Sequence, residues 1–199
     1  SGLNVKNYAK AFQIAPIAQY YGNSILVTFF GIILNLIIMS MAAYVLSRFQ
    51  FRFQGLIRTM FSMGLLIPGA ALLLPLYTSV SAVGLYDSLW GLIVVYVGFG
   101  IPTSLFILSS YYKTNPREMA ESAYLDGAGF VTAYLHIILP LARPAFATAG
   151  VMQFLLCWNE FQFALTLTTG HQSRTLPIAL YYFKSAFASD YGAMFAAVA

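Results

Sequence analysis

Long stretches without a charged residue alternate with short polar connections along this chain. They cover residues 25–46, 59–86, 88–112 and 144–169, the last interrupted only by Glu160, and a further one begins near Tyr191. The first four are each above the roughly 20 residues that a helix needs to cross a bilayer, and the fifth is only part of a span. The alternation of apolar and polar residues that marks membrane strands is missing, so helices must satisfy the backbone in lipid. The pattern predicts an all-α membrane protein, a polytopic bundle of about five spans.

Local signals refine two of these spans. Asn23 and Ser24 precede the first apolar stretch and suit a helix N-cap, so we expect the first helix to begin there. Pro68 and Pro75 lie inside the second stretch, where proline removes a backbone donor and clashes with the preceding turn. We therefore expect that span to be kinked or broken.

Composition agrees with lipid as the main solvent. Only 8% of the 199 residues are charged, 60% are hydrophobic and the mean hydropathy is +0.76, whereas about 25% of residues are charged in a soluble domain. The net charge of +4 comes from basic residues dispersed at the ends of apolar stretches, which does not indicate nucleic-acid binding. The single cysteine, Cys157, excludes an internal disulfide and a cysteine metal site.

Both ends of the chain look abrupt. It starts at Ser1-Gly2 without a recognisable signal peptide, and its last apolar stretch is still hydrophobic at Ala199. We therefore expect one transmembrane domain, residues 1–199, truncated at both ends.

The basic residues predict the orientation. Six lie in the connections after the first and third spans: Arg48, Arg52, Arg58, Lys113, Arg117 and Arg143. Four lie in the opposite segments: Lys6, Lys10, Arg174 and Lys184. Because Lys and Arg in short loops favour the cytoplasm, the polar loop of about residues 112–143 is predicted to be cytoplasmic.

This polar loop carries its own helix signals. Asn115, Pro116 and Glu118 suit the N-cap, N1 and N3 positions of a short helix, which Gly127 and Gly129 would end. Residues 130–138 suit a second short helix, with prolines at 140 and 144 bracketing the return to the membrane. Such an element suits docking in a groove of another protein. The competing interpretation is a solvated connection between two spans.

The spacing within the loop carries a resemblance. Glu121-Ser122-Ala123 is followed by three residues and Gly127, and then by nine residues, Ile137, one residue and Leu139-Pro140. This closely resembles the EAA loop of the membrane subunits of binding-protein-dependent ABC importers. The resemblance implies that loop 116–140 docks on an ATPase and couples its movement to transport. The residues implied for ATPase coupling are Glu121, Ala123, Gly127, Ile137, Leu139 and Pro140.

Further motifs resemble the carbohydrate-uptake branch of that family, in its maltose-permease second-subunit type. They are Asp126-Gly127-Ala128-Gly129, Leu139-Pro140-Leu141-x-x-Pro144, Trp158-Asn159-Glu160-Phe161 and Thr175-Leu176-Pro177. The resemblance extends from about Tyr21 to the C-terminus, with Ser122 where alanine is usual. From the resemblance we expect that this sequence lacks the family's first spanning helix and the end of the last.

Fold, partners and location follow from the same resemblance. It implies the type I ABC importer permease fold in the plasma (inner) membrane, with multiple passes, as a subunit importing a sugar or oligosaccharide. Its implied partners are ABC ATPase subunits, a second permease subunit in a heterodimer and an extracytoplasmic solute-binding protein. The chain lacks a Gly-x-x-x-x-Gly-Lys-Ser/Thr sequence. We therefore expect a transport subunit rather than an enzyme, with no cofactor of its own and with ATP and Mg used by the partner ATPase subunits.

Glu160 is the one acidic residue inside an apolar stretch. A charge near mid-bilayer costs about 3 kcal/mol on insertion scales, so Glu160 should face protein or water. One interpretation makes it a translocation-path residue, with Asn159 and Gln162 as hydrogen-bonding neighbours. The other, which we favour, makes it a structural partner for a polar group on a neighbouring helix or on the other membrane subunit.

Three alternatives stay open. The first keeps the ABC permease and changes the solute to a polyol, an osmolyte or a polyamine. An intramembrane enzyme would need paired polar groups at membrane depth, and Glu160 has no such companion in the sequence. An ion-coupled transporter would show internal repeats and several intramembrane ionisable groups, and neither is evident.

Overall fold

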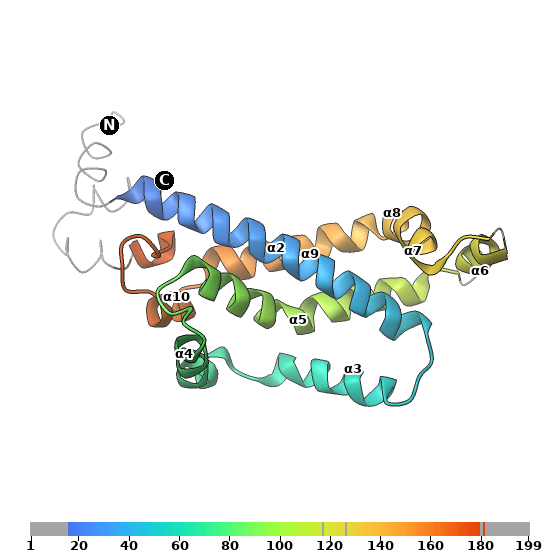
Figure 1. Ribbon diagram of the computed structural model, residues 1–199, viewed down its shortest axis with the longest axis horizontal. Coiled ribbons are helices and arrows are strands. Elements are labelled where there is room, and N and C mark those ends of the chain that lie inside the picture. Colours follow the sequence, from blue (N-terminus) through green and yellow to red (C-terminus); the bar gives the residue numbers. More distant parts are fainter. Residues whose placement is uncertain (1–15, 117, 126, 180, 182–199) are drawn as a thin grey trace, which may run out of the picture. The chain divides into compact units, whose positions relative to one another are not determined.

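A computed structural model describes residues 16–116, 118–125, 127–179 and 181, apart from the side chains of residues 119–121 (Figure 1). The stretch predicted to begin near Tyr191 lies outside these residues. The described helices, in chain order, are α2 (Ile17–Arg48), α3 (Gln54–Met63), α4 (Leu73–Ala82), α5 (Leu89–Thr114), α6 (Glu118–Leu125), α7 (Phe130–Ala133), α8 (Leu139–Leu141), α9 (Arg143–Asn159) and α10 (Gln162–Leu167).

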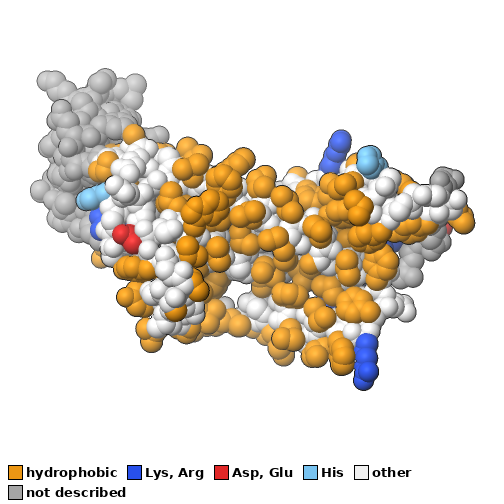
Figure 2. Space-filling view, viewed as in Figure 1, with side chains coloured by type: hydrophobic (Ala, Val, Ile, Leu, Met, Phe, Trp, Pro, Cys, Tyr) orange, Lys and Arg blue, Asp and Glu red, His pale blue; other side chains and the backbone are white. Residues whose placement is uncertain are grey.

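The long helices match the apolar stretches. Within the described residues, α2 and α5 are each long and apolar enough to cross a membrane, and up to four spans result if each of two bent helix pairs counts as one. The bent pairs are α3 with α4, and the α7–α8 segment with α9. On the face seen in Figure 2, hydrophobic side chains are abundant and few charged ones are visible. The predicted polytopic helical membrane protein is confirmed, and four is the upper count of described spans.

The chain forms two compact units. The first comprises Ser1–Gly31, Pro68–Tyr96 and Leu156–Ala199, and the second comprises Ile32–Ile67 and Val97–Leu155. The polar loop belongs to the second unit and Glu160 to the first. Each unit is described separately below.

In the first unit, the predicted start of the first helix is wrong. α2 begins at Ile17, so Asn23 and Ser24 lie inside the helix, where both are buried. Their side chains bind the backbone of a distant segment instead of capping. Asn23 Nδ2 donates to the carbonyl oxygens of Gln172 and Arg174, each at 2.8 Å, and Ser24 Oγ accepts from the Leu176 amide at 2.8 Å. Asn23 and Ser24 therefore attach α2 to the segment of residues 172–176 and do not cap the helix.

Of the two prolines in the second stretch, one breaks the helix. Pro68 has an extended backbone (φ −68°, ψ 129°) between the 3-10 turns Gly64–Leu66 and Gly69–Leu72. Pro75 lies in the first turn of α4, where the missing amide hydrogen would have no intrahelical partner. The predicted break of this span is confirmed, and it lies at Pro68.

The core of the second unit joins α2, α5, α9 and the polar loop. Its buried members are Met39, Ala43, Tyr44, Leu46, Leu105, Leu108, Tyr112, Tyr134, Ile138, Ala142, Ala145 and Ala149. Two glycines allow close helix contacts beside it. A Cβ at Gly64, directly after α3, would lie 2.6 Å from Pro102 Cγ of α5, and a Cβ at Gly100 of α5 would lie 1.8 Å from Gln153 Oε1 of α9. A side chain at Gly64 would displace Pro102, and a side chain at Gly100 would displace the buried amide of Gln153.

Candidate functional site

The first helix of the polar loop, α6, ends in a glycine-dependent turn. Gly127 has a φ of +83°, the left-handed conformation that glycine adopts without a steric penalty. The Ala128 amide donates to the Ala123 carbonyl at 2.9 Å, and the Gly127 amide donates to the Tyr124 carbonyl at 3.1 Å. These two bonds form a Schellman motif, which satisfies carbonyl groups that the helix end leaves free. The predicted termination by Gly127 is confirmed.

The other boundary predictions for this loop were less accurate. α6 begins at Glu118, so Asn115 and Pro116 precede it instead of providing the N-cap and N1. Gly129 does not end α6. It has an extended backbone (φ −73°, ψ 167°) and directly precedes α7. The N-cap and N1 predictions for Asn115 and Pro116 are therefore wrong.

The second helix of the loop is longer than predicted. α7 continues through a π-helical turn, Tyr134–Ile138, into α8, so the helical segment ends at Leu141 rather than at residue 138. Pro140 lies in the first turn of α8 and is exposed, so it does not mark the end of the segment. Ile137 and Leu139 are half-buried against the core of the second unit.

A cluster of aromatic side chains holds the loop against the membrane helices. We call it the tyrosine cluster: Tyr44 and Phe49 at the end of α2, Tyr112 of α5, and Phe130 and Tyr134 of the loop. Tyr44 is its centre, with ring centroids 5.2–5.9 Å from those of the other four residues. Pairs at this separation add about 0.5–1.5 kcal/mol each beyond the area that they bury.

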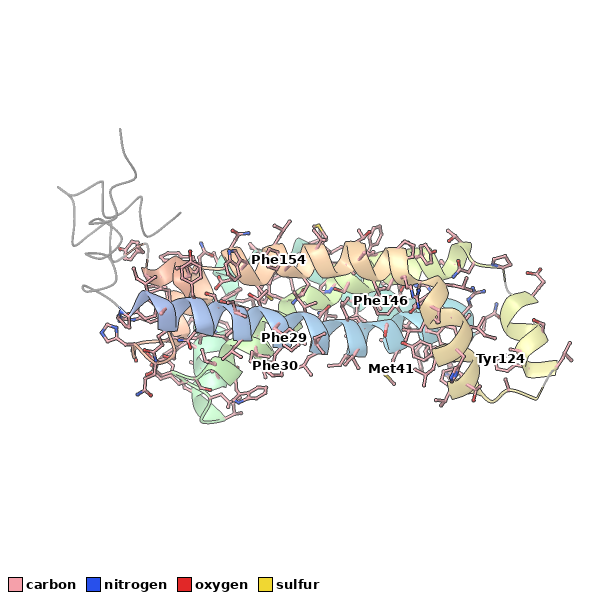
Figure 3. All side chains as sticks on the ribbon, turned by 90° about the horizontal axis from the view of Figure 1, so that it is seen from above. Phe29, Phe30, Met41, Tyr124, Phe146 and Phe154 are labelled. Carbon is pink, nitrogen blue, oxygen red and sulfur yellow. The ribbon has the colours of Figure 1, made fainter. Side chains whose placement is uncertain are left out.

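Hydrogen bonds tie the same surfaces together. Tyr134 Oη and Ser40 Oγ are 2.6 Å apart in a buried contact between the loop and α2. Tyr44 Oη lies 3.4 Å from Tyr124 Oη of α6 (Figure 3 labels Tyr124). At the two ends of the loop, Arg48 Nη2 donates to the Asn115 carbonyl at 2.8 Å and Tyr111 Oη donates to the Leu141 carbonyl at 2.9 Å. The loop is thus attached at both ends and in its middle.

Sequence reasoning missed these anchoring residues. The only available signal was a gathering of tyrosines at one end of the apolar stretches. Tyrosines at that position are equally expected from the aromatic belts at membrane interfaces. Spacing along the chain could not distinguish the two roles.

The outward side of α6 is apolar at its end. Leu125 is 89% exposed, although it lies in the last turn of a helix whose Ala123 is buried. Leu125 is the last residue of α6, two residues before Gly127 in its left-handed conformation. The side chain of Glu121, the predicted first residue of the motif, lies outside the described part of the structure. Of the six predicted coupling residues, the other five belong to this one anchored loop.

Glu160 occupies a separate site in the first unit. Its Oε1 accepts from the Phe163 amide at 2.8 Å, and its Oε2 accepts from the Ala164 amide at 2.9 Å and from Tyr96 Oη at 2.8 Å. The carboxylate thus takes the first free amides of α10, and the predicted single span over residues 144–169 is divided at Glu160 into α9 and α10. Asn159 is the last residue of α9, and Gln162 is exposed in the first turn of α10.

A second carboxylate of the first unit was not singled out from the sequence. Asp87, in a left-handed conformation (φ 55°) between α4 and α5, accepts from the amides of Thr169 and Gly170 at 2.8 and 3.0 Å and from Ser173 Oγ. These hydrogen bonds, that from Ser173 foremost, lower the pKa of Asp87 to about 2. Asp87 therefore holds the turn of residues 168–173.

The described residues contain no group of three His, Cys, Asp or Glu side chains that could hold a metal ion. What they contain defines a class of protein: an integral membrane protein of apolar helices with one structured polar loop anchored between two of them. The family can also be stated. This chain belongs to the family of the binding-protein-dependent transport system inner membrane component, whose match covers residues 35–199.

Relatives support the family. The chain is 36% identical over 195 residues to the diacetylchitobiose uptake system permease protein NgcG of Streptomyces coelicolor, covering 97% of this chain and 65% of that protein. It is 34% identical over 183 residues to the trehalose/maltose transport system permease protein MalG of Thermococcus litoralis, covering 90% of this chain and 66% of that protein. The chain thus spans about 65% of the length of these relatives.

The fold also matches a solved structure. A bacterial ABC transporter involved in the import of the acidic polysaccharide alginate aligns with a TM-score of 0.81, at 22% sequence identity, over 98% of this chain and 68% of that one. The predicted permease fold is confirmed.

Proposed function

We propose that this chain is the membrane-spanning permease subunit of an ATP-driven importer, and that loop 116–140 receives the movement of an ATPase subunit. The anchoring of this loop carries the proposal. A loop that only connected two spans would not need a buried hydrogen bond, a tyrosine cluster and a backbone bond at each end. A loop that transmits a movement must be rigidly attached, because a flexible attachment would let the loop move without moving the membrane helices.

The mechanism follows from the two sides of the loop. The exposed side presents Leu125 at the end of α6, which suits an apolar contact in a groove of a partner. The buried side presents Ala123, Tyr134 and Ile138, with Tyr134 and Ile138 packed in the core formed with α2, α5 and α9. A displacement of the partner would therefore move the loop and the ends of three membrane helices as one body. Alternating access would follow from that movement.

The proposed cargo is a sugar or oligosaccharide. The names of the two relatives concern diacetylchitobiose and trehalose/maltose, and the motifs noted in the sequence resemble the carbohydrate-uptake branch. We propose Asn159, Glu160 and Gln162 as candidates for the translocation path, with Glu160 also capping α10. Three donors already bind the Glu160 carboxylate: the amides of Phe163 and Ala164 and the Tyr96 hydroxyl. We therefore expect Glu160 to position the residues beside it rather than to bind the solute directly.

The proposed assembly contains further subunits. They are the ABC ATPase subunits, which would use ATP and Mg, a second permease subunit in a heterodimer and an extracytoplasmic solute-binding protein. Its location would be the plasma membrane, with loop 116–140 on the cytoplasmic side.

The test uses the full-length protein in its purified, reconstituted transporter. Leu125→Asp places a charge on the surface proposed to contact the ATPase subunit, at a side chain that is 89% exposed and packs little against the rest of the chain. We expect loss of ATPase subunit co-purification or of solute-stimulated ATP hydrolysis. The matched control is Leu125→Met, which keeps an apolar side chain of similar volume and should behave like the wild type.

One result would contradict the proposal. If Leu125→Asp and Glu121→Lys both retain the ATPase subunits and normal stimulated hydrolysis, the loop is a connector. The function would then have to be sought around Glu160.

A further inference from the structure

A cationic pocket lies between α3 and α5 in the second unit. Its volume is about 170 Å³, which is room for roughly six water molecules at about 30 Å³ each. Arg58 and Ser62 of α3 line it on one side, and Ser109, Ser110 and Lys113 of α5 line it on the other, with apolar side chains including Phe106. A group of the size of a phosphate fits this volume.

The pocket has an excess of hydrogen-bond donors. Arg58 donates through Nη2 to the Leu46 carbonyl, while its Nε is buried and has no hydrogen-bond partner in the described structure. Three serine hydroxyls can donate as well, and the described lining contains no carboxylate. Two cations without an acidic neighbour favour an anionic occupant.

The pocket has a polar end and an apolar end. Lys113 lies in the last turn of α5. Phe106 lies seven residues earlier, which is about 10 Å deeper along the helix at 1.5 Å per residue. Phe106 is 64% exposed, so an apolar surface continues inward from the charged end. A free phosphate ion would use only the charged end.

We propose that this pocket binds the phosphate of an anionic phospholipid from the leaflet on the side of loop 116–140, with an acyl chain lying along Phe106. Basic pockets between membrane helices on that side are typical sites for anionic lipid headgroups. This lipid site rests on the proposed function in one respect, the assignment of that leaflet to the cytoplasmic side. Lipid binding itself does not depend on ATPase coupling.

The experiment is a lipid titration of the full-length protein in its delipidated transporter, followed by native mass spectrometry. Phosphatidylglycerol is compared with phosphatidylcholine, and inorganic phosphate is added as a competitor. We expect Lys113→Gln to weaken phosphatidylglycerol binding roughly five-fold, since each basic residue near an anionic lipid surface contributes about that factor. Ser62→Asp should weaken it at least as much, because position 62 is one turn from Arg58 on α3 and an aspartate there can pair with it.

A matched control separates the pocket from general surface charge. Thr59→Asp introduces the same charge on the same helix, at an exposed position outside the pocket lining, and should change the affinity less than two-fold. Equal losses in Ser62→Asp and Thr59→Asp would overturn the proposal. So would equal binding of the two lipids, or displacement of the lipid by millimolar phosphate. Lys113→Gln and Ser62→Asp should leave co-purification of the ATPase subunits normal. Failure of the proposed coupling function would instead appear in co-purification or ATP hydrolysis and not in lipid binding.

Discussion

The contact around Gly100 allows a sharp test of the helix packing. Gly100 of α5 is buried, and a Cβ built on it would lie 1.8 Å from Gln153 Oε1 of α9 and 2.8 Å from Asn35 Nδ2 of α2. Both amide side chains are themselves buried, and Asn35 donates to the Val97 carbonyl at 3.0 Å. They have little room to move away from an added methyl group. Gly100→Ala therefore requires a shift of α9 or the loss of a polar contact.

The expected magnitude combines two effects. Overpacking a well-filled contact costs about 1–3 kcal/mol, whereas replacing a mid-helix glycine by alanine contributes about 0.5–1 kcal/mol of stability. Gly100→Ala should thus lower the free energy of unfolding by about 1–2 kcal/mol. Gly98 lies two residues earlier on α5, and a Cβ added there would have nothing within 4 Å. Gly98→Ala should therefore stabilise the protein by about 0.5–1 kcal/mol.

The assay is thermal unfolding of the full-length protein in its purified transporter, with both variants at equal detergent and lipid content. A difference of about 2 kcal/mol corresponds to roughly 4–8 °C between the two variants for a chain of this size. Adding Gln153→Ala to Gly100→Ala should remove most of the clash and appear as a coupling between the two positions. If both glycine variants shift the midpoint equally, or if Gln153→Ala gives no relief, the described packing of α5 against α9 is refuted.

Three further predictions concern the loop and the first unit. Gly127→Ala should weaken ATPase subunit binding about five-fold, because the left-handed conformation costs alanine about 1 kcal/mol. Asparagine tolerates that conformation better, so Gly127→Asn should lose less binding affinity. Equal losses of affinity in the two variants would contradict the role of the turn. Ser40→Ala should lower the free energy of unfolding by about 0.5–1.5 kcal/mol by removing the buried hydrogen bond between Ser40 and Tyr134. An unchanged thermal midpoint would exclude this anchor. The pKa of Asp87 is lowered from 3.8 to about 2, so the contribution of Asp87 to stability is present above pH 3.8 and is lost as the pH falls to about 2. In the wild type, hydrogen-exchange protection of the Thr169 and Gly170 amides should fall over that interval. In Asp87→Asn, this protection should already be low at about pH 5.

The sequence predicted the features that depend on local physics. The uncharged stretches predicted α2 and α5, because a helix in lipid must be apolar along its length. Gly127 predicted the end of α6, because one residue in a left-handed conformation suffices to stop a helix. These signals lie within a few residues of the structure that they specify.

The features that were missed depend on distant partners. Asn23 and Ser24 had the residue types of an N-cap but bind backbone groups 149–152 residues away. The attachment of the loop at residue 115 was missed for a related reason, since Arg48 binds a main-chain carbonyl 67 residues later in the chain and no residue type marks such an acceptor. No spacing rule distinguishes a capping side chain from a tertiary anchor of the same type.

The two terminal anchors of the polar loop have a consequence for protein engineering. Arg48 and Tyr111 hold the main-chain oxygens of residues 115 and 141, and every amino acid supplies such an oxygen. The side chains at those two positions can therefore change without removing the attachment. A chimaera that carries the loop of another importer between residues 115 and 141 should seat on this scaffold if Arg48, Tyr111 and Tyr44 are kept. Exchange of recognition between ATPase partners would then need no redesign of the membrane helices.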